Sequence, residues 1–214
     1  MLINSINSDS TICALATAMG GAIGIIRVSG NRTIEIVNSI FTKNLNEAKP
    51  NTVHYGHIIN EQGKIIDEVL ISIFHAPHSY TGENSAEISC HGSQYILSTV
   101  LELLIKNGAT LAKPGEFTQR AYLNGKIDLS QAEAVADLIS STTEATHNIA
   151  ISQLKGHFSS ELHILRNQLL HLTTLLELEL DFSDHEELEF ADRGELQEIA
   201  RKIDKKNYIT CPIL

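Results

Sequence analysis

Short apolar runs rich in β-branched residues, bounded by Gly, Pro or Asn, fill much of the chain between Thr11 and Leu111. Runs of this kind predict β-strands. A four-residue segment containing Gly63 separates two of the runs, and its length is typical of the loop that joins antiparallel strands. We expect strands at Thr11–Ala16, Ile23–Val28, Thr52–Ile59, Ile65–Phe74 and Ala86–Cys90.

Helical spacing interrupts this strand pattern at about Thr33–Phe41 and about Gln94–Asn107. In the second segment Ile96 and Val100 begin an apolar face with a helical period, and Gly108 provides a stop. Strands and helices in this order predict a mixed α+β domain.

After Asp128, a candidate helix cap, the pattern is helical and contains no proline until Pro212. A heptad seam of aromatic and leucine positions then follows alternating spacings of four and three, at Phe158, Leu162, Leu165, Leu169, Leu172 and Leu176. We interpret this seam as the core face of an antiparallel bundle, because it is too short for a free coiled coil. The predicted organisation is an α+β domain over residues 1–124 and an all-α helical-bundle segment over 125–214.

The composition of the chain limits the classes of function that it can have. The 214 residues include 43% hydrophobic residues, enough for one sizeable core or two modest ones. Lys and Arg number 16 and Asp and Glu 26, and the net charge of −10 disfavours direct wrapping of nucleic acid. The three cysteines show no paired spacing, which favours a reducing compartment. The amino terminus shows neither a signal peptide nor a membrane span, so we expect a cytoplasmic protein without membrane contact.

Polar residues and glycines concentrate in three segments, Thr11–Gly30, Pro77–Gly92 and Gly115–Leu129. The last is too polar for a core, and something must satisfy its charged groups. We interpret it as a binding loop that positions Arg120 and Lys126 ahead of the next helix, although an ordinary surface connection has the same composition.

In their order and separations these three motifs closely resemble the MnmE (TrmE) family of tRNA-modification GTPases, over about Ser10 to about Glu195. The resemblance implies a tetrahydrofolate-binding, dimer-forming amino-terminal domain with the fold of folate-binding aminomethyltransferases, followed by a helical domain. It also implies work on the wobble uridine of tRNA, through the full complex, with an MnmG (GidA)-like flavoprotein. The one-carbon carrier expected is 5-formyltetrahydrofolate or 5,10-methylenetetrahydrofolate.

A pterin ring offers a ring N–H beside an exocyclic amine, and a carboxylate accepts both in a bidentate hydrogen bond. Glu83 and Glu87 are the candidates in the second motif. On a strand, Glu87 would point away from the face of Ala86 and Ile88 and sit on a rigid element, whereas Glu83 falls in a flexible turn. We therefore assign pterin recognition to Glu87, as the resemblance also implies.

The resemblance further implies that Arg27 and Lys126 contact the folate. A guanidinium can form a fork to a carboxylate of the glutamyl tail. The alternatives are an internal salt bridge for Arg27 and a free surface position for Lys126.

No Gly-x-x-x-x-Gly-Lys-Ser/Thr sequence occurs, so the phosphate-binding loop of a GTPase is missing. We expect GTP, Mg²⁺ and K⁺ to belong only to the full-length protein, and this portion not to be catalytic alone. The last residues, 207–214, depart from the family's continuation and suggest a truncation or an altered reading frame.

No catalytic residue is assigned, and the spacing of the histidine pairs does not favour a metal site. The acidic stretch over residues 177–198 is interpreted as a solvated face, with a divalent-cation site as the alternative. Two other functions stay open: a stand-alone folate-dependent one-carbon or aminomethyl transferase, and a non-catalytic dimerisation module.

Overall fold

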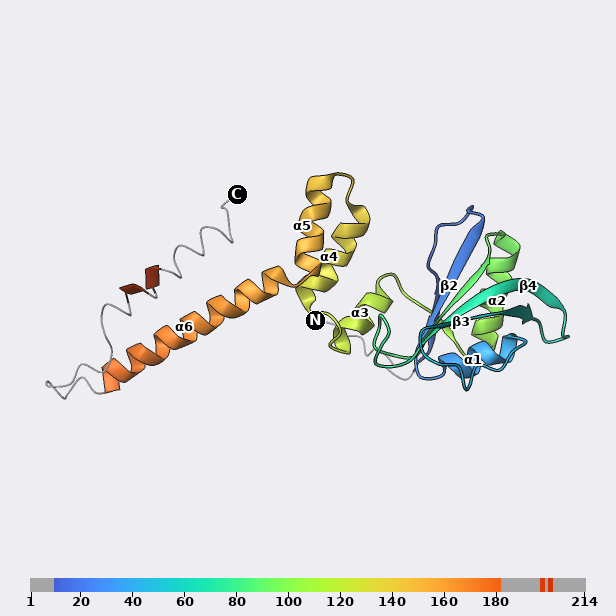
Figure 1. Cartoon of the computed structure of the whole chain (residues 1–214), viewed down its shortest axis with the longest axis horizontal. Coiled ribbons are helices and arrows are strands. Elements are labelled where there is room, and N and C mark those ends of the chain that lie inside the picture. Colours follow the sequence, from blue (N-terminus) through green and yellow to red (C-terminus); the bar gives the residue numbers. More distant parts are fainter. Residues whose placement is uncertain (1–9, 182–196, 199, 202–214) are drawn as a thin grey trace. The chain divides into compact units, whose positions relative to one another are not determined.

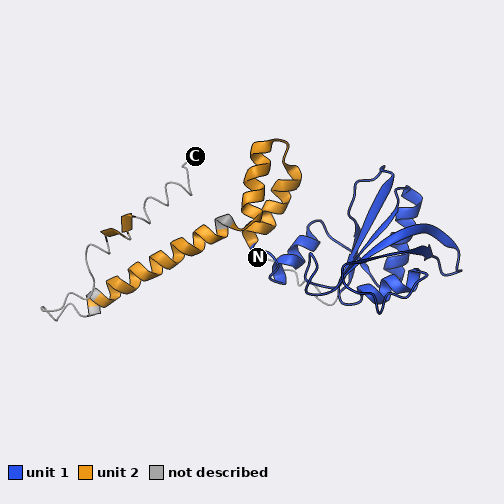
Figure 2. Ribbon diagram, viewed as in Figure 1, with its two compact units in different colours: residues 1–128 blue, residues 129–214 orange. Residues whose placement is uncertain are grey.

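The structure, a computed structural model, describes residues 10–181, 197–198 and 200–201 (Figure 1). The chain divides into two compact units, residues 1–128 and 129–214 (Figure 2). The sequence placed this boundary after residue 124. The segment that follows is bonded back into unit 1, because Lys126 Nζ donates to Pro77 O at 3.0 Å, next to the side-chain amide of Asn124, which donates to Thr81 O at 2.7 Å.

Unit 1 is built on a six-stranded mixed sheet with the strand order β3-β4-β5-β2-β1-β6. All neighbours are antiparallel except β1 and β6. The strands are β1 Ile12–Leu15, β2 Ile23–Ser29, β3 Thr52–Ile59, β4 Ile65–Phe74, β5 Ser85–His91 and β6 Thr110–Leu111. The strands predicted from the sequence are confirmed. The short β6 was missed because two residues carry no periodicity.

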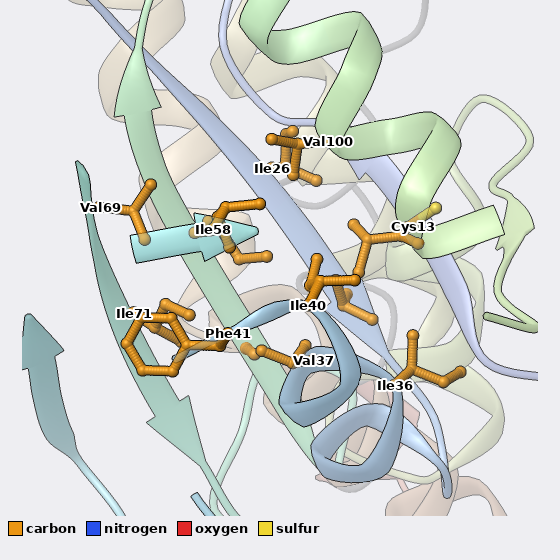
Figure 3. Close-up of a cluster of buried hydrophobic side chains, with 14 of the residues drawn as sticks. Cys13, Ile26, Ile36, Val37, Ile40, Phe41, Ile58, Val69, Ile71 and Val100 are labelled. Atoms are coloured by element: carbon orange, nitrogen blue, oxygen red, sulfur yellow. The ribbon is translucent and has the colours of Figure 1, made fainter. Parts of the chain in front are cut away.

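Two helices, α1 (Thr33–Ile40) and α2 (Gln94–Lys106), cover one face of the sheet. Every second residue of the central strands meets them in a single apolar core (Figure 3). Ile26, Ile71 and Ile88 are fully buried there. The alternation in β5, with Ala86 and Ile88 buried and Glu87 on the other side, confirms the predicted orientation of Glu87.

The opposite face of the sheet is open over part of β2, β3 and β4. Large side chains are exposed on this face because α1 and α2 pack on the other. We call these side chains the open sheet face: Ile23 (63% exposed), Val53 (60%), Tyr55 (52%) and Leu70 (47%).

The interpretation of Gly115–Leu129 as a loop is wrong. Glu116–Leu123 forms a helix, α3, which follows Gly115 in the left-handed conformation with φ 77°. The expectation that the segment is too polar for a core is also wrong, since Arg120 and Ala121 are buried. On the buried side of this helix Arg120, a charged residue, stands where an apolar residue is usual, so the pattern of apolar residues did not predict the helix.

Unit 2 begins with a helical hairpin of α4 (Leu129–Ser140) and α5 (Glu144–Leu154). Helix α4 starts directly after Asp128, the predicted cap. Thr143 caps α5 in a reciprocal capping box with Thr146, and Gln131 donates from α4 to Leu154 O at 2.8 Å. The hairpin confirms the all-α character of this unit.

The heptad seam lies in α6 (His157–Asp181), a continuous helix. Leu162, Leu169 and Leu176 of the seam are 44%, 45% and 47% exposed, so the described residues leave much of this predicted core face uncovered. The acidic stretch beyond residue 181, up to residue 196, and the tail 207–214 lie outside the described residues.

Candidate functional site

Two of the predicted site residues meet on neighbouring strands. Arg27 of β2 and Glu87 of β5 are direct partners in the antiparallel register. Arg27 Nε and Nη2 donate to the same oxygen, Glu87 Oε1, at 2.9 and 2.7 Å. The side chains are 31% and 28% exposed, so this ion pair is half-buried on the face opposite α1 and α2. Cross-strand pairing fixes both charged groups on rigid elements.

Aromatic rings flank the Arg27 guanidinium. The ring of Tyr80 lies 5.4 Å from Arg27 Cζ, and that of Phe117, on α3, lies 5.6 Å away. A hydrogen bond of 2.9 Å joins Tyr80 Oη to Thr118 Oγ1 and so links the two flanking elements. Cations are attracted to the faces of aromatic rings at these distances. The arrangement therefore orients Arg27 toward Glu87.

Lys126, the third predicted site residue, is exposed and lies against the loop that carries Tyr80. Its ammonium donates to Pro77 O at 3.0 Å, and its stem lies beside Gly82. The contacts of the described residues join Lys126 to this loop rather than to Arg27 or Glu87. The structure thus brings Arg27 and Glu87 together and places Lys126 on an adjoining segment.

Sequence reasoning missed a buried cluster around Glu83. The expectation of a flexible turn is wrong for this side chain, which is 14% exposed and forms an ion pair with Arg120 Nη1 at 3.1 Å. Ser29 Oγ also donates to Glu83 Oε2, at 2.7 Å. Because internal donors occupy both carboxylate oxygens, Glu83 is a poor candidate for pterin recognition. One feature of the sequence pointed to this cluster: the charged groups of the polar segment that contains Arg120 need partners.

At the far end of β5 a second carboxylate orients a histidine. Asp67, with a side chain 7% exposed, accepts from the backbone N–H of His91 at 2.8 Å and lies 2.7 Å from His91 Nδ1. The neighbouring Cys90 is buried on the opposite side of the strand. Burial, and secondarily the charge of Asp67, raises the pKa of Cys90 to about 12. Cys90 therefore stays a protonated, unreactive thiol.

No three His, Cys, Asp or Glu side chains in the described part gather into a possible metal site. Among the helices within the described ranges, none has the length and apolar character needed to cross a bilayer.

The fold defines a two-domain class, in which an α+β domain with one helix-covered sheet face precedes a helical domain. Residues 11–126 match the family model of the GTP-binding protein TrmE N-terminus, and residues 129–208 match that of the MnmE helical domain. The chain belongs to the MnmE (TrmE) family.

Curated relatives carry the name tRNA modification GTPase MnmE. The chain is 60% identical over 203 residues to the protein of Bacteroides fragilis, covering 92% of this chain and 43% of that relative. It is 56% identical over 236 residues to the protein of Phocaeicola vulgatus, covering 94% of this chain and 47% of that relative. The chain thus spans less than half the length of the curated relatives it matches.

Proposed function

We propose that unit 1 holds a one-carbon tetrahydrofolate, in the 5-formyl or 5,10-methylene form, with Glu87, Arg27 and Lys126 as its contacts. The observation that carries this proposal is the half-buried carboxylate of Glu87, fixed by Arg27 on the sheet. Within the described residues Glu87 Oε2 accepts no hydrogen bond, so the carboxylate retains acceptor capacity for the paired donors of a pterin.

The two cations have different surroundings, which suits them to different tasks. Arg27 is paired with Glu87, so it holds the pterin acceptor in place and contacts the ligand beside it. The ammonium of Lys126 is exposed and donates to the neutral carbonyl of Pro77, and no carboxylate of the described residues forms an ion pair with it, so it is available to a glutamyl carboxylate of folate.

In the full-length protein, we propose, the bound one-carbon unit serves tRNA modification. A carboxymethylaminomethyl or aminomethyl group would be built at C5 of the wobble uridine, together with an MnmG (GidA)-like flavoprotein and with GTP, Mg²⁺ and K⁺ at a separate domain. The name of the relatives, tRNA modification GTPase, supports this assignment.

The first test is calorimetric titration of the purified chain with 5-formyltetrahydrofolate. We expect saturable binding that Glu87→Ala weakens by about 1.5–3 kcal/mol, the scale of a lost hydrogen bond to a charged group. Glu68→Ala is the matched control, because Glu68 is an exposed carboxylate on the same face of the neighbouring β4. It should leave the affinity unchanged.

Equal affinities of wild type and Glu87→Ala would contradict the site, and absence of binding by a folded wild-type chain would contradict the cofactor assignment.

A stand-alone transferase would in addition need a carboxylate able to act on substrate. Glu83 and Glu87 are both engaged in ion pairs, which disfavours that alternative.

A homodimer is the second part of the proposal, and the open sheet face is its candidate surface. The exposed Tyr55 and Leu70 are direct partners across β3 and β4, so they form one apolar patch on a rigid support. Contiguous exposed apolar surface of this kind marks interaction sites.

A further inference from the structure

A buried charged cluster joins α3 to the loop between β4 and β5. Arg120 is only 2% exposed, and its Nη1 lies 3.1 and 3.3 Å from the two carboxylate oxygens of Glu83. Its Nη2 donates to Glu116 Oε1 at 3.1 Å. Removing one partner of such a buried pair leaves an uncompensated charge, so the cluster strongly resists separation of its two elements.

Hydroxyl groups connect this cluster to the strands that carry the candidate site. Ser29 Oγ donates to Glu83 Oε2 at 2.7 Å and also lies 2.7 Å from Thr81 Oγ1. Ser29 is the β2 residue directly opposite Ser85 of β5. The pair formed by Arg27 and Glu87 lies one step along the same face of the same two strands. The cluster is thus anchored to the sheet beside the site.

Both aromatic flanks of Arg27 are attached to the same cluster. Phe117 lies on α3 one turn before Arg120, and Tyr80 lies in the loop shortly before Glu83. Besides this ion pair, one hydrogen bond described within α3 itself reaches the loop, between Thr118 Oγ1 and Tyr80 Oη, and just after α3 the side chains of Asn124 and Lys126 donate to the loop carbonyls of Thr81 and Pro77.

We propose that the ion pair of Arg120 and Glu83 is a positioning device for the ligand site. It keeps Tyr80 and Phe117 against the guanidinium of Arg27, and thereby holds Arg27 on Glu87, without itself touching the ligand. The role in ligand binding rests on the proposed folate function. The role in orienting Arg27 concerns this chain alone and is measurable without a ligand.

The ligand-free test is NMR of the Arg27 Nε–H group in the whole chain. Because the centroids of both rings lie within 5.6 Å of Arg27 Cζ, we expect their ring currents to displace the resonance of this proton. In Glu83→Gln, which removes the charge and keeps the shape, we expect that resonance to move toward the position of an unflanked arginine. Backbone resonances of the core strands should stay unchanged. The control is Glu35→Gln, because Glu35 forms an exposed ion pair with Arg32 on α1.

Titration with 5-formyltetrahydrofolate then measures the consequence for binding. We expect Glu83→Gln to raise Kd about tenfold through lost preorganisation, with Glu35→Gln unchanged. Arg120→Lys keeps the charge but not the fork, so both its resonance shift and its Kd should be intermediate. It also carries the test if Glu83→Gln does not fold.

An unchanged Arg27 resonance in a folded Glu83→Gln or Arg120→Lys chain would overturn the positioning role. A displaced resonance with an unchanged Kd would overturn its importance for binding. A wild-type chain that binds no folate, yet shows the resonance shift on Glu83→Gln, would sink the folate proposal and support the orienting role alone.

Discussion

At the scale of residues, the two glutamates of one motif have different surroundings. Both carboxylate oxygens of Glu83 contact internal partners, whereas Glu87 accepts from Arg27 at one oxygen. The period of a strand predicted the orientation of Glu87 from the sequence. Nothing in the sequence pairs Glu83 with Arg120, because ion pairs between distant segments leave no local pattern. The strand positions of the candidate residues Arg27 and Glu87 were therefore predictable from the sequence, and the contacts that support them were not.

Buried thiols give a prediction at this scale. Desolvation raises the pKa of Cys13 to about 11 from an ordinary 9.0, and the pKa of Cys90 to about 12. In a Cys211→Ser variant, we expect no reaction of the folded chain with a thiol-specific disulfide reagent at pH 8, and two reactive thiols after unfolding. Absorbance of the released reagent thiol measures this. Rapid release from the folded chain would contradict the burial of these side chains.

The same pKa shifts fix the sign of a pH effect on stability. The folded chain holds these thiol protons more tightly than the unfolded chain does. Their contribution to the free energy of unfolding is complete below pH 9, and is lost as the pH rises toward 11 and 12.

At the scale of elements, apolar periodicity predicted the strands of the sheet and the helices α1 and α2, whose inner faces are apolar. It failed for α3, whose inner face carries Arg120, and for β6, which is too short to show a period.

Glycines determine how closely elements approach. A Cβ on Gly92 would overlap the carbonyl oxygen of Gly21, which is backbone and has no rotamer to relieve the clash.

Substitution at this close approach is testable. We expect Gly92→Ala to lower the free energy of unfolding by about 3 kcal/mol, the upper range for overpacking a tight contact. Gly21→Ala should stay within about 0.5 kcal/mol, because its Cβ would meet only Ile23 O at 3.4 Å. Denaturant unfolding followed by circular dichroism compares the two. Equal stabilities would show that the β2 and β5 ends separate easily.

At the scale of the whole molecule, the change of period near Asp128 predicted the order of an α+β unit and a helical unit. Strand order and register could not be predicted, because they depend on which distant segments pair. The exposed faces could not be predicted either, since the sequence pattern of Tyr55 and Leu70 is that of any half-buried strand.

Association through the open sheet face is the prediction at this scale. Analytical ultracentrifugation of the chain should show a dimer that Leu70→Lys dissociates, because a charge is placed in the middle of the apolar patch. Leu162→Lys on α6 is the control for association through the other exposed apolar surface. Dissociation by the second variant but not by the first would move the interface to the helical unit.

The direct opposition of Arg27 and Glu87 across β2 and β5 also has an evolutionary consequence. Replacing either residue alone leaves an unpaired charge on the neighbouring strand, so we expect single replacements to persist only briefly in any lineage. Lineages are then expected to keep both residues or to lose both on the same branch. A joint loss of the two would be a marker, readable from genomes alone, for descendants that have lost the proposed folate site.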